Sequence, residues 1–456
     1  MTDNNRNAAD TQTVRAGAGD CAESRLLMSR RAMLGGLSAG LFSLAYMPRF
    51  AEAAGDNGPR LLIVVLRGGM DGINTVVPFG DSNYISMRGS LAIPAASTIQ
   101  LDSFFGLHPA LTNFGNLYKS GQAAAVHATC VPLRNRSHFD AQDNLENGLG
   151  GRGSQTGWLN RLLSELPAGE PIRTAGAVQI GESPVILRGP APVLGWSPTW
   201  FWNVDNPTLD TIRTLYRDTD PQMGGMLERG LKADALAGAA NGDGDIGLLR
   251  EGFRGAGRLL AAVDGPRIAV LCIDGWDTHI DQGGTQGQHA GLLAELDTAI
   301  GDFRASLGAA WQNTVMICAT EFGRTVRING NNGTDHGVGT VTLLAGGAVN
   351  GGNVFGDWPG LAPNQLYEGS DLTPTTDLRA VFKGVLRDHL GVPVTMLNST
   401  VFPSSTGILP MSNLVKPSTS LNRIRTRAVA ASPTAPIEAP IAQYRRARAA
   451  ARVAAN

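Results

Sequence analysis

The chain has 456 residues, 38 lysines and arginines against 39 aspartates and glutamates, and a formal net charge of −1. Such an even balance creates no overall field that would recruit nucleic acid or an anionic membrane surface, so neither partner is expected. The length fits two or three average domains, or one large α/β domain with appended segments. Glycine is frequent, at 58 residues, but periodic apolar segments recur between the glycines and predict tight turns rather than disorder.

Residues 1–53 are predicted to be an export signal. Arg30 and Arg31 directly precede a weakly hydrophobic, glycine-rich run at 32–47, and small residues that fit a cleavage site follow it. This order is typical of the twin-arginine route, and it predicts a periplasmic or secreted protein that meets the twin-arginine translocase during export. A short membrane anchor is the alternative. The run is too short to cross ~30 Å of hydrocarbon comfortably, so we expect no stable membrane span.

Continuous apolar runs follow a predicted linker at residues 54–60. They lie at residues 61–66, 123–128, 267–273, 314–320 and 340–345. Runs without polar alternation indicate strands that are buried on both faces, as in a parallel sheet. Helical patterns lie between them, at residues 158–166, 245–262, 288–307 and 377–390. This alternation predicts an α/β fold over residues 61–410, with a doubly wound, mostly parallel sheet flanked by helices.

The end of the chain has a different composition. From residue 411 it is rich in alanine, proline and arginine, with seven arginines against the single acid Glu438. A segment that cannot bury apolar area stays unfolded, so residues 411–456 are predicted to be a basic, disordered tail. Tethering to a surface is the alternative to a merely solvated end.

Polar residues follow four of the predicted strands. They lie at residues 67–72, 134–140, 274–279 and 321–324. In open parallel sheets, ligands bind beyond the carboxyl ends of the strands. The four strand ends therefore predict one shared cleft.

Acidic and imidazole side chains recur at these ends and in the loop before the last strand. They are Asp71, Asp274, Asp277, His279, Glu321, Asp335 and His336. Oxygen and imidazole ligands without a cysteine suit Zn, Mn, Mg or Ca, and two metals that clamp an oxyanion would need about this many ligands. Each residue alone also has a structural explanation, such as a helix cap, or an ion pair between Glu321 and Arg324. The set as a whole favours a divalent-metal site.

Two further features bear on the substrate and the nucleophile. Arg67, Arg134, Arg136 and Arg324 lie at the same strand ends. A guanidinium group binds phosphate, sulfate or carboxylate through paired hydrogen bonds, so these arginines suit an anionic small molecule or polymer, although salt bridges to the acids explain them equally well.

Ser137, just before a helical pattern, is either a helix cap or a nucleophile. No Gly-x-Ser-x-Gly elbow follows any of the predicted strands, which argues against a metal-free serine hydrolase, and no Gly-x-Gly-x-x-Gly follows the first predicted strand, where a dinucleotide site would require it.

Several motifs, taken in order, resemble the bacterial family called domain of unknown function 1501. They lie at residues 66–72, 74–78, 136–143, 277–279, 321–324 and 335–337, and the resemblance covers about residues 60–410. That family is grouped with the alkaline phosphatase and sulfatase superfamily. The resemblance therefore implies an alkaline-phosphatase-like doubly wound fold, one or two divalent metals at the strand ends, and export by the twin-arginine route.

Carried over to this chain, the resemblance implies a role for each matching residue. Asp71 would be the acidic metal ligand that follows the first strand, and Ser137 would be the nucleophile. Asp277 and His279 would bind one metal. Glu321 would stand where the superfamily usually has an aspartate ligand, and His336 would be the histidine ligand nearest the end of the domain. Two departures stand out. Arg67 holds the position where the superfamily has its first aspartate, and Phe322 stands where an imidazole is usual.

The leading hypothesis from the sequence is an exported, metal-dependent hydrolase of phosphate or sulfate esters. Its metal ligands would be Asp71, Asp277, His279, Glu321, Asp335 and His336. Arg324 and the metal would stabilise the oxyanion while Ser137 or water attacks. The competing hypothesis is a catalytically inactive exported binding or scaffold protein that retains the fold.

Cys130 offers a separate hypothesis. With Pro132 and Arg134 it matches the core of the sulfatase signature, in which the cysteine becomes formylglycine. The residues that follow do not continue that signature, so a buried thiol is the favoured interpretation.

Overall fold

The computed structural model describes residues 58–151, 153–166, 176–182, 184–198, 206–238 and 244–417. The predicted export signal, most of the linker and most of the tail lie outside these ranges. All described residues fall in one compact unit, Pro48–Asn456. In these ranges no helix has both the length and the apolar character needed to cross a membrane.

A nine-stranded sheet forms the centre of this unit, with strand order β13-β5-β12-β9-β1-β8-β6-β7 and β14 paired with β5. Its strands are β1 (Arg60–Leu66), β5 (Ala123–Cys130), β6 (Ala177–Ile180), β7 (Leu194–Trp196), β8 (Ile268–Ile273), β9 (Thr314–Ala319), β12 (Thr340–Ala345), β13 (Val354–Phe355) and β14 (Thr376–Asp377). Every pairing is parallel except those of β12, which runs antiparallel to β5 and β9. The predicted mostly parallel sheet is confirmed.

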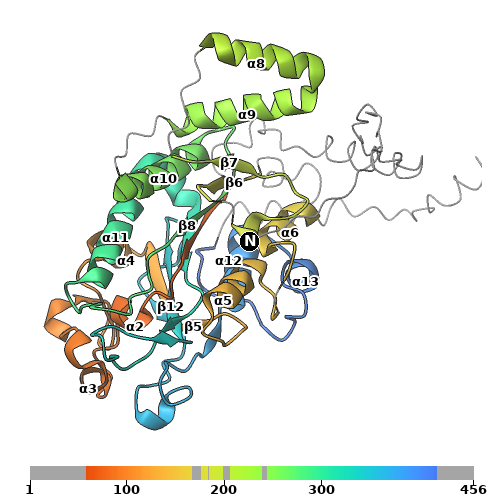
Figure 1. Ribbon diagram of the computed structural model, residues 1–456. Helices are drawn as coiled ribbons and strands as arrows, with labels where there is room; N and C mark the ends of the chain where they lie inside the picture. Colours follow the sequence, from red (N-terminus) through yellow and green to blue (C-terminus); the bar gives the residue numbers. More distant parts are fainter. Residues whose placement is uncertain are drawn as a thin grey trace, which may run out of the picture. The chain divides into compact units, whose positions relative to one another are not determined.

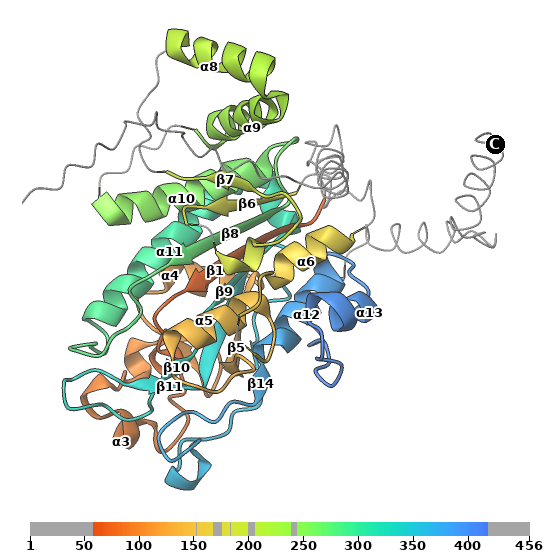
Figure 2. The ribbon, with the colours of Figure 1, turned by 45° about the vertical axis from the view of Figure 1, so that its right-hand side comes forward.

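Helices cover both faces of the sheet (Figures 1 and 2). On one face lie α4 (Thr112–Lys119), α10 (Gly244–Ala261) and α11 (Gln288–Leu307), and on the other lie α5 (His138–Asn147), α6 (Trp158–Glu165) and α12 (Leu378–His389). Alternate residues of β1 enter the two cores: Leu62 packs with the first set, and Ile63 with the second. Because both faces are buried, the strand shows no polar alternation, as the sequence predicted.

The remaining elements are short or lie towards the surface. They are α2 (Gly72–Thr75), α3 (Tyr84–Arg88), α8 (Asn206–Thr219), α9 (Pro221–Ala237), α13 (Val394–Met396), a small sheet of β2 (Val76–Val77), β3 (Ile99–Gln100) and β4 (Gly106–Leu107), and the antiparallel pair β10 (Gly323–Arg324) and β11 (His336–Gly337). The sequence patterns missed α8 and α9. Leu215 on α8 and Met223 and Met226 on α9 are exposed, whereas Ala233 and Ala237 of α9 are buried in the core.

The packed region extends past the predicted start of the tail at residue 411. Leu414 and Val415 are buried, and the backbone N–H of Met411 donates to the carbonyl of Ala380 in α12. Although most of the residues around them are polar, Leu414 and Val415 extend the hydrophobic core that packs against α12. The structure therefore corrects the predicted boundary, since residues 411–417 are part of the fold.

Candidate metal centre

Three histidines and one aspartate converge at the carboxyl edge of the sheet. The Nε2 atom of His336 lies 2.9 Å from Nε2 of His279, 3.0 Å from Nε2 of His138 and 3.1 Å from Oδ1 of Asp277. Asp277 also approaches the other two imidazoles, with Oδ1 3.1 Å from His279 and Oδ2 3.4 Å from His138. Four groups from three separate loops thus lie close together, with His336 and Asp277 each in contact with both other imidazoles.

The fold explains why these residues meet. His138 opens α5, which follows β5, and Asp277 and His279 lie in the loop that follows β8. His336 lies in β11, just before β12. Because β12 runs against its neighbours, its first residues lie at the edge where β5 and β8 end. This reversal brings a residue that precedes a strand to residues that follow strands.

An oxygen faces the Nδ1 atom of each histidine. Nδ1 of His138 lies 2.7 Å from Oε1 of Glu321, and Nδ1 of His336 lies 2.9 Å from the carbonyl oxygen of Arg136. The third, in His279, lies 3.4 Å from Oδ1 of Asp335. A carbonyl or an ionised carboxylate only accepts, so the Nδ1 atoms of His138 and His336 carry the protons and the lone pairs of their Nε2 atoms point at each other.

The protonation equilibria reflect the same contacts. The hydrogen bond with Glu321 raises the pKa of His138, whereas burial lowers the pKa of His336. Burial alone would raise the pKa of Glu321, but hydrogen bonds from His138 and Gln142 outweigh it and keep this pKa below its usual value. Asp277 is likewise kept acidic, since the hydrogen bond from Arg324 overcomes the effect of burial on its pKa. The carboxylates are therefore ionised at neutral pH.

The arrangement fits a divalent metal. Lone pairs of neutral imidazoles repel at these distances unless a cation lies between them. A tetrahedral ion with bonds of about 2.0–2.1 Å places its ligand atoms about 3.3 Å apart, and the spacings among His138, Asp277 and His336 run from 3.0 to 3.4 Å. His138, Asp277 and His336 form the group of three close metal-ligating atoms found in the described ranges. The centre is open to solvent, because the side chain of Asp277 is 44% exposed and that of His336 22%.

Glu321 lies behind this centre. Its side chain is fully buried, and Oε1 accepts from Gln142 (3.0 Å) and from the backbone N–H of Gly68 (2.8 Å) as well as facing His138. Oε2 accepts from Thr320 (3.0 Å). In this arrangement both carboxylate oxygens have protein partners, and Glu321 orients a ligand. Asp335 is more exposed and lies 3.4 Å from Nδ1 of His279, and it accepts a hydrogen bond from Asn329 (3.0 Å).

Asp71 is placed in a separate buried network. It caps the N-terminus of α2, where Oδ1 accepts from the backbone N–H groups of Ile73 and Asn74, and it forms a fully buried ion pair with Arg88. Gln282 links this pair to the centre indirectly. Its Nε2 donates to Oδ2 of Asp71 (2.5 Å).

Gln282 also joins the two loops that carry the ligands. Its Oε1 accepts from the hydroxyls of Thr278 (3.0 Å) and Thr334 (2.6 Å). Thr278 lies between Asp277 and His279, and Thr334 lies two residues before His336. Gln282 therefore fixes the spacing between the two loops.

Arg324 is fully buried, and its donors are directed at the loops around the centre. The guanidinium donates to Oδ1 of Asp277 (2.5 Å). Its other acceptors are the backbone carbonyls of Gly68, Gly69, Trp276 and Thr334. This arrangement holds the loops together and orients Asp277, and a substrate would reach the guanidinium only by displacing one of these acceptors.

The other arginines of the predicted cleft also have partners. Arg67 lies 2.9 Å from Glu146 and 3.3 Å from Glu182. Arg136 contacts Asp371 at 2.7 Å and Glu368 at 2.8 Å. Arg134 stacks over the ring of Tyr367.

Ser137 occupies the N-cap position of α5, but its side chain makes no capping hydrogen bond. The residues on both sides of it contact the centre, because the carbonyl of Arg136 faces His336 and His138 is itself one of the four groups. Asp274, by contrast, is exposed and borders a separate cavity.

Sequence reasoning left three contributing residues out of the predicted site. His138 lies in one of the polar segments that follow a predicted buried strand. Asp277 was chosen because of such a position, and the same criterion applied to His138. Gln142, one helical turn later, follows from His138. Nothing in the sequence marked Gln282, because its role depends on how two distant loops fold.

Cys130 at the end of β5 is 5% exposed, and burial raises the pKa of its thiol to about 11. We expect an unmodified thiol, since neither a modifying enzyme nor an oxidant has ready access to a buried, protonated sulfur. Peptide mass spectrometry of the protein recovered from its native compartment checks this. An aldehyde at position 130 would contradict it.

Comparisons with known proteins agree with part of the sequence resemblance. A family model described as a protein of unknown function, DUF1501, matches residues 211–399. A search of curated proteins found no match.

Similar solved structures include Ps i-CgsB, at 15% identity and TM-score 0.36 over 76% of each chain. They also include the PsFucS1 sulfatase from Pseudoalteromonas sp., at 13% identity and TM-score 0.36 over 86% of this chain and 78% of that one. A third is the phosphonate monoester hydrolase of Agrobacterium radiobacter, at 12% identity and TM-score 0.33 over 74% of each chain. At these scores the similarity says nothing about the reaction.

Proposed function

We propose that the protein is a metal-dependent hydrolase of phosphate or sulfate esters with one zinc-type centre. The observation that carries the proposal is the convergence of three Nε2 atoms and one carboxylate, each Nδ1 facing an oxygen. Three imidazoles favour zinc among the ions considered from the sequence, because Mg and Ca prefer oxygen ligands throughout. The ester class follows from the family resemblance.

The residues of the chain have distinct parts in this proposal. His138, Asp277, His279 and His336 are the proposed ligands, and a divalent ion bound by them would supply Lewis-acid polarisation. Glu321 and Asp335 hold two imidazoles in the tautomer that leaves Nε2 free. Ser137 is the proposed nucleophile, with attack by water as the alternative, because it lies between two residues that serve the centre and does not cap its helix.

The surroundings of the centre narrow the proposed substrate. Phe139 and Ile280 directly follow two of the histidines and are 86% and 61% exposed. In this proposal, these two side chains contact an apolar part of the substrate. Since Arg67, Arg136 and Arg324 are paired with carboxylates, a substrate with one ester anion and an apolar organic part fits better than a polyanion.

Metal analysis of the purified protein tests the proposal. We expect about one zinc-type ion per chain and a lower thermal midpoint after treatment with a chelator, because an ion that binds only the native state stabilises it. We also expect the loaded protein to cleave aryl phosphate or aryl sulfate esters faster than glycerol phosphate. The hydrolase fails if no stoichiometric metal is found and the chelator leaves the midpoint unchanged.

A binding protein without catalysis is the second candidate. The burial of Arg324 and the pairing of the other arginines favour it, since an active site for anionic esters usually offers a cation to the developing charge. A protein that binds metal, cleaves none of the aryl esters and still binds their non-hydrolysable analogues would support this candidate.

A further inference from the structure

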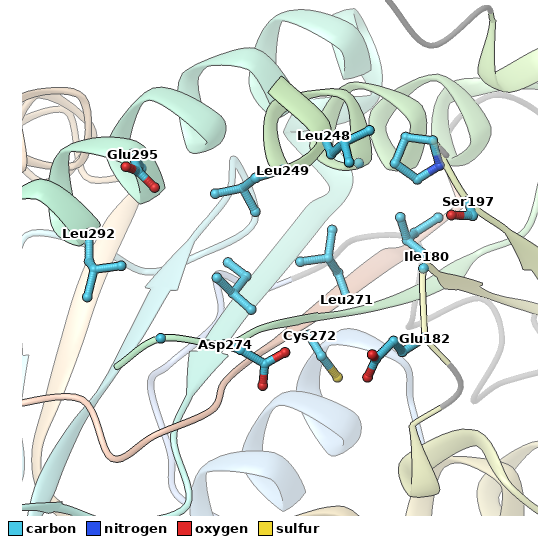
Figure 3. A pocket seen from close by; sticks show the side chains of 15 residues that line it. Ile180, Glu182, Ser197, Leu248, Leu249, Leu271, Cys272, Asp274, Leu292 and Glu295 are labelled. Atoms are coloured by element: carbon cyan, nitrogen blue, oxygen red, sulfur yellow. The ribbon is translucent and has the colours of Figure 1, made fainter. Parts of the chain in front are cut away.

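A second cavity, of about 590 Å³, lies at the carboxyl ends of β6 and β8, between these strands and helices α10 and α11 (Figure 3). Its volume falls in the range typical of small-molecule sites. The loop that leaves β8 borders this cavity with Asp274 and Gly275 and then continues to the metal ligand Asp277. The cavity has its own lining, none of which belongs to the four ligands.

The walls are aliphatic. Leu248 and Leu249 come from α10, Leu292 from α11, and Leu271 and Ile273 from β8. Figure 3 shows these leucines around one space, with Ile180 of β6 closing a further side. Such walls exclude water from the body of a ligand, and the burial of its apolar surface favours binding.

The charged groups that line the cavity are all carboxylates, Glu182, Asp274 and Glu295, and no lysine, arginine or histidine borders it. Arg67 is the basic group that contacts this set. Its guanidinium is shared between Glu182 and the buried Glu146. In the part of the chain that the structure describes, Asp274 and Glu295 form no hydrogen bond or salt bridge, and Arg67 acts on Asp274 through space. The carboxylates at the edge of the apolar space therefore outnumber the one basic group near them.

We infer that this cavity is a binding site for an organic cation with an aliphatic body, such as an alkylamine. An ammonium group next to Asp274 and Glu295 gains charge-assisted hydrogen bonds while its chain lies against the leucines. A carboxylate of the same shape meets like charges, and an alcohol gains the apolar contact alone. The inference does not depend on the metal centre.

Three probes of equal length test the site: octylamine, octanol and octanoate, titrated calorimetrically into the full chain. We expect the amine to bind at least about tenfold more tightly than the alcohol, and octanoate to show no binding at the cavity. The advantage of the amine should shrink in high salt, because exposed charges are screened. Equal affinity for octanoate and octylamine would overturn the inference.

Variants locate the binding. Asp274→Asn and Glu295→Gln should each weaken octylamine by about fivefold, the size expected of one solvent-accessible ion pair, and leave octanol unchanged. Asp218→Asn, which neutralises an exposed acid on α8, is the matched control and should change neither affinity. Leu249→Trp fills the cavity and should abolish the binding of both probes. If this variant fails to fold, the double variant Asp274→Asn/Glu295→Gln decides, and unchanged amine affinity in it rejects the site.

Discussion

Replacement of His336 by alanine is expected to weaken zinc binding by more than about 100-fold, beyond the 10–100-fold typical of outer-shell residues. His336 is the ligand that the other three approach, at 2.9–3.1 Å for its closest contacts with His279, His138 and Asp277. Without it, Asp277 is the one neighbour that the two remaining imidazoles of the candidate centre share. Competition with a fluorescent zinc chelator measures the affinity directly.

Matched variants separate the ligands from the residues behind them. Asp277→Asn should lose the metal as His336→Ala does, whereas Glu321→Gln should weaken binding by about 10–100-fold, because it removes the carboxylate that fixes the tautomer of His138. Asp335→Asn, behind the more exposed His279, should have the smallest effect. Stoichiometric zinc in both His336→Ala and Asp277→Asn would show that the metal, if bound, lies elsewhere.

A steep loss of stability on acidification is the second large effect that we expect. His127, His289 and His389 are buried and neutral, and burial lowers their pKa values to about 4, about 3 and about 4. In the unfolded chain each would titrate near pH 6.5. The unfolded state therefore takes up protons first, so the stability is complete above about pH 6.5 and is lost as the pH falls towards 4.

Each such histidine contributes a slope of about 1.4 kcal/mol per pH unit, so the three together give roughly 4 kcal/mol per unit between about pH 6 and pH 4.5. Urea unfolding at a series of pH values measures this slope. His389→Gln keeps a donor for the carbonyl of Arg60, which Nε2 of His389 contacts at 2.8 Å, and it removes one titration. Its slope should be smaller by about one proton, and an unchanged slope would show that other groups cause the acid sensitivity.

The sheet could be predicted from the sequence because each central strand is buried on both faces and reads as an unbroken apolar run. The direction of β12 could not, since an apolar run has the same appearance in either direction. Its antiparallel pairing depends on the folded loop between β9 and β12, where β10 and β11 pair with each other. The position of His336 at the site edge follows from that loop.

A position after a predicted strand marks a residue as a candidate for the site, but it does not show which groups that residue contacts. Asp277, His279 and His336 were expected and do converge, whereas the contacts of Asp71 are with α2, Arg88 and Gln282. From the sequence, an aspartate just before the start of a helix can be predicted equally well to be a helix N-cap or a metal ligand. Only the folded chain shows that Arg88 turns back to it.

The reversed strand also sets the order in which the protein can mature. His138 and His336 lie 198 residues apart in the chain and approach each other only after β5 and β12 have paired. Bringing together the ends of so long a segment lowers the entropy of the chain, and contacts between residues close in sequence do not compensate for this loss. In the proposed centre, the full set of ligands exists only once the sheet is complete, so binding of an ion there would report that the sheet has been completed.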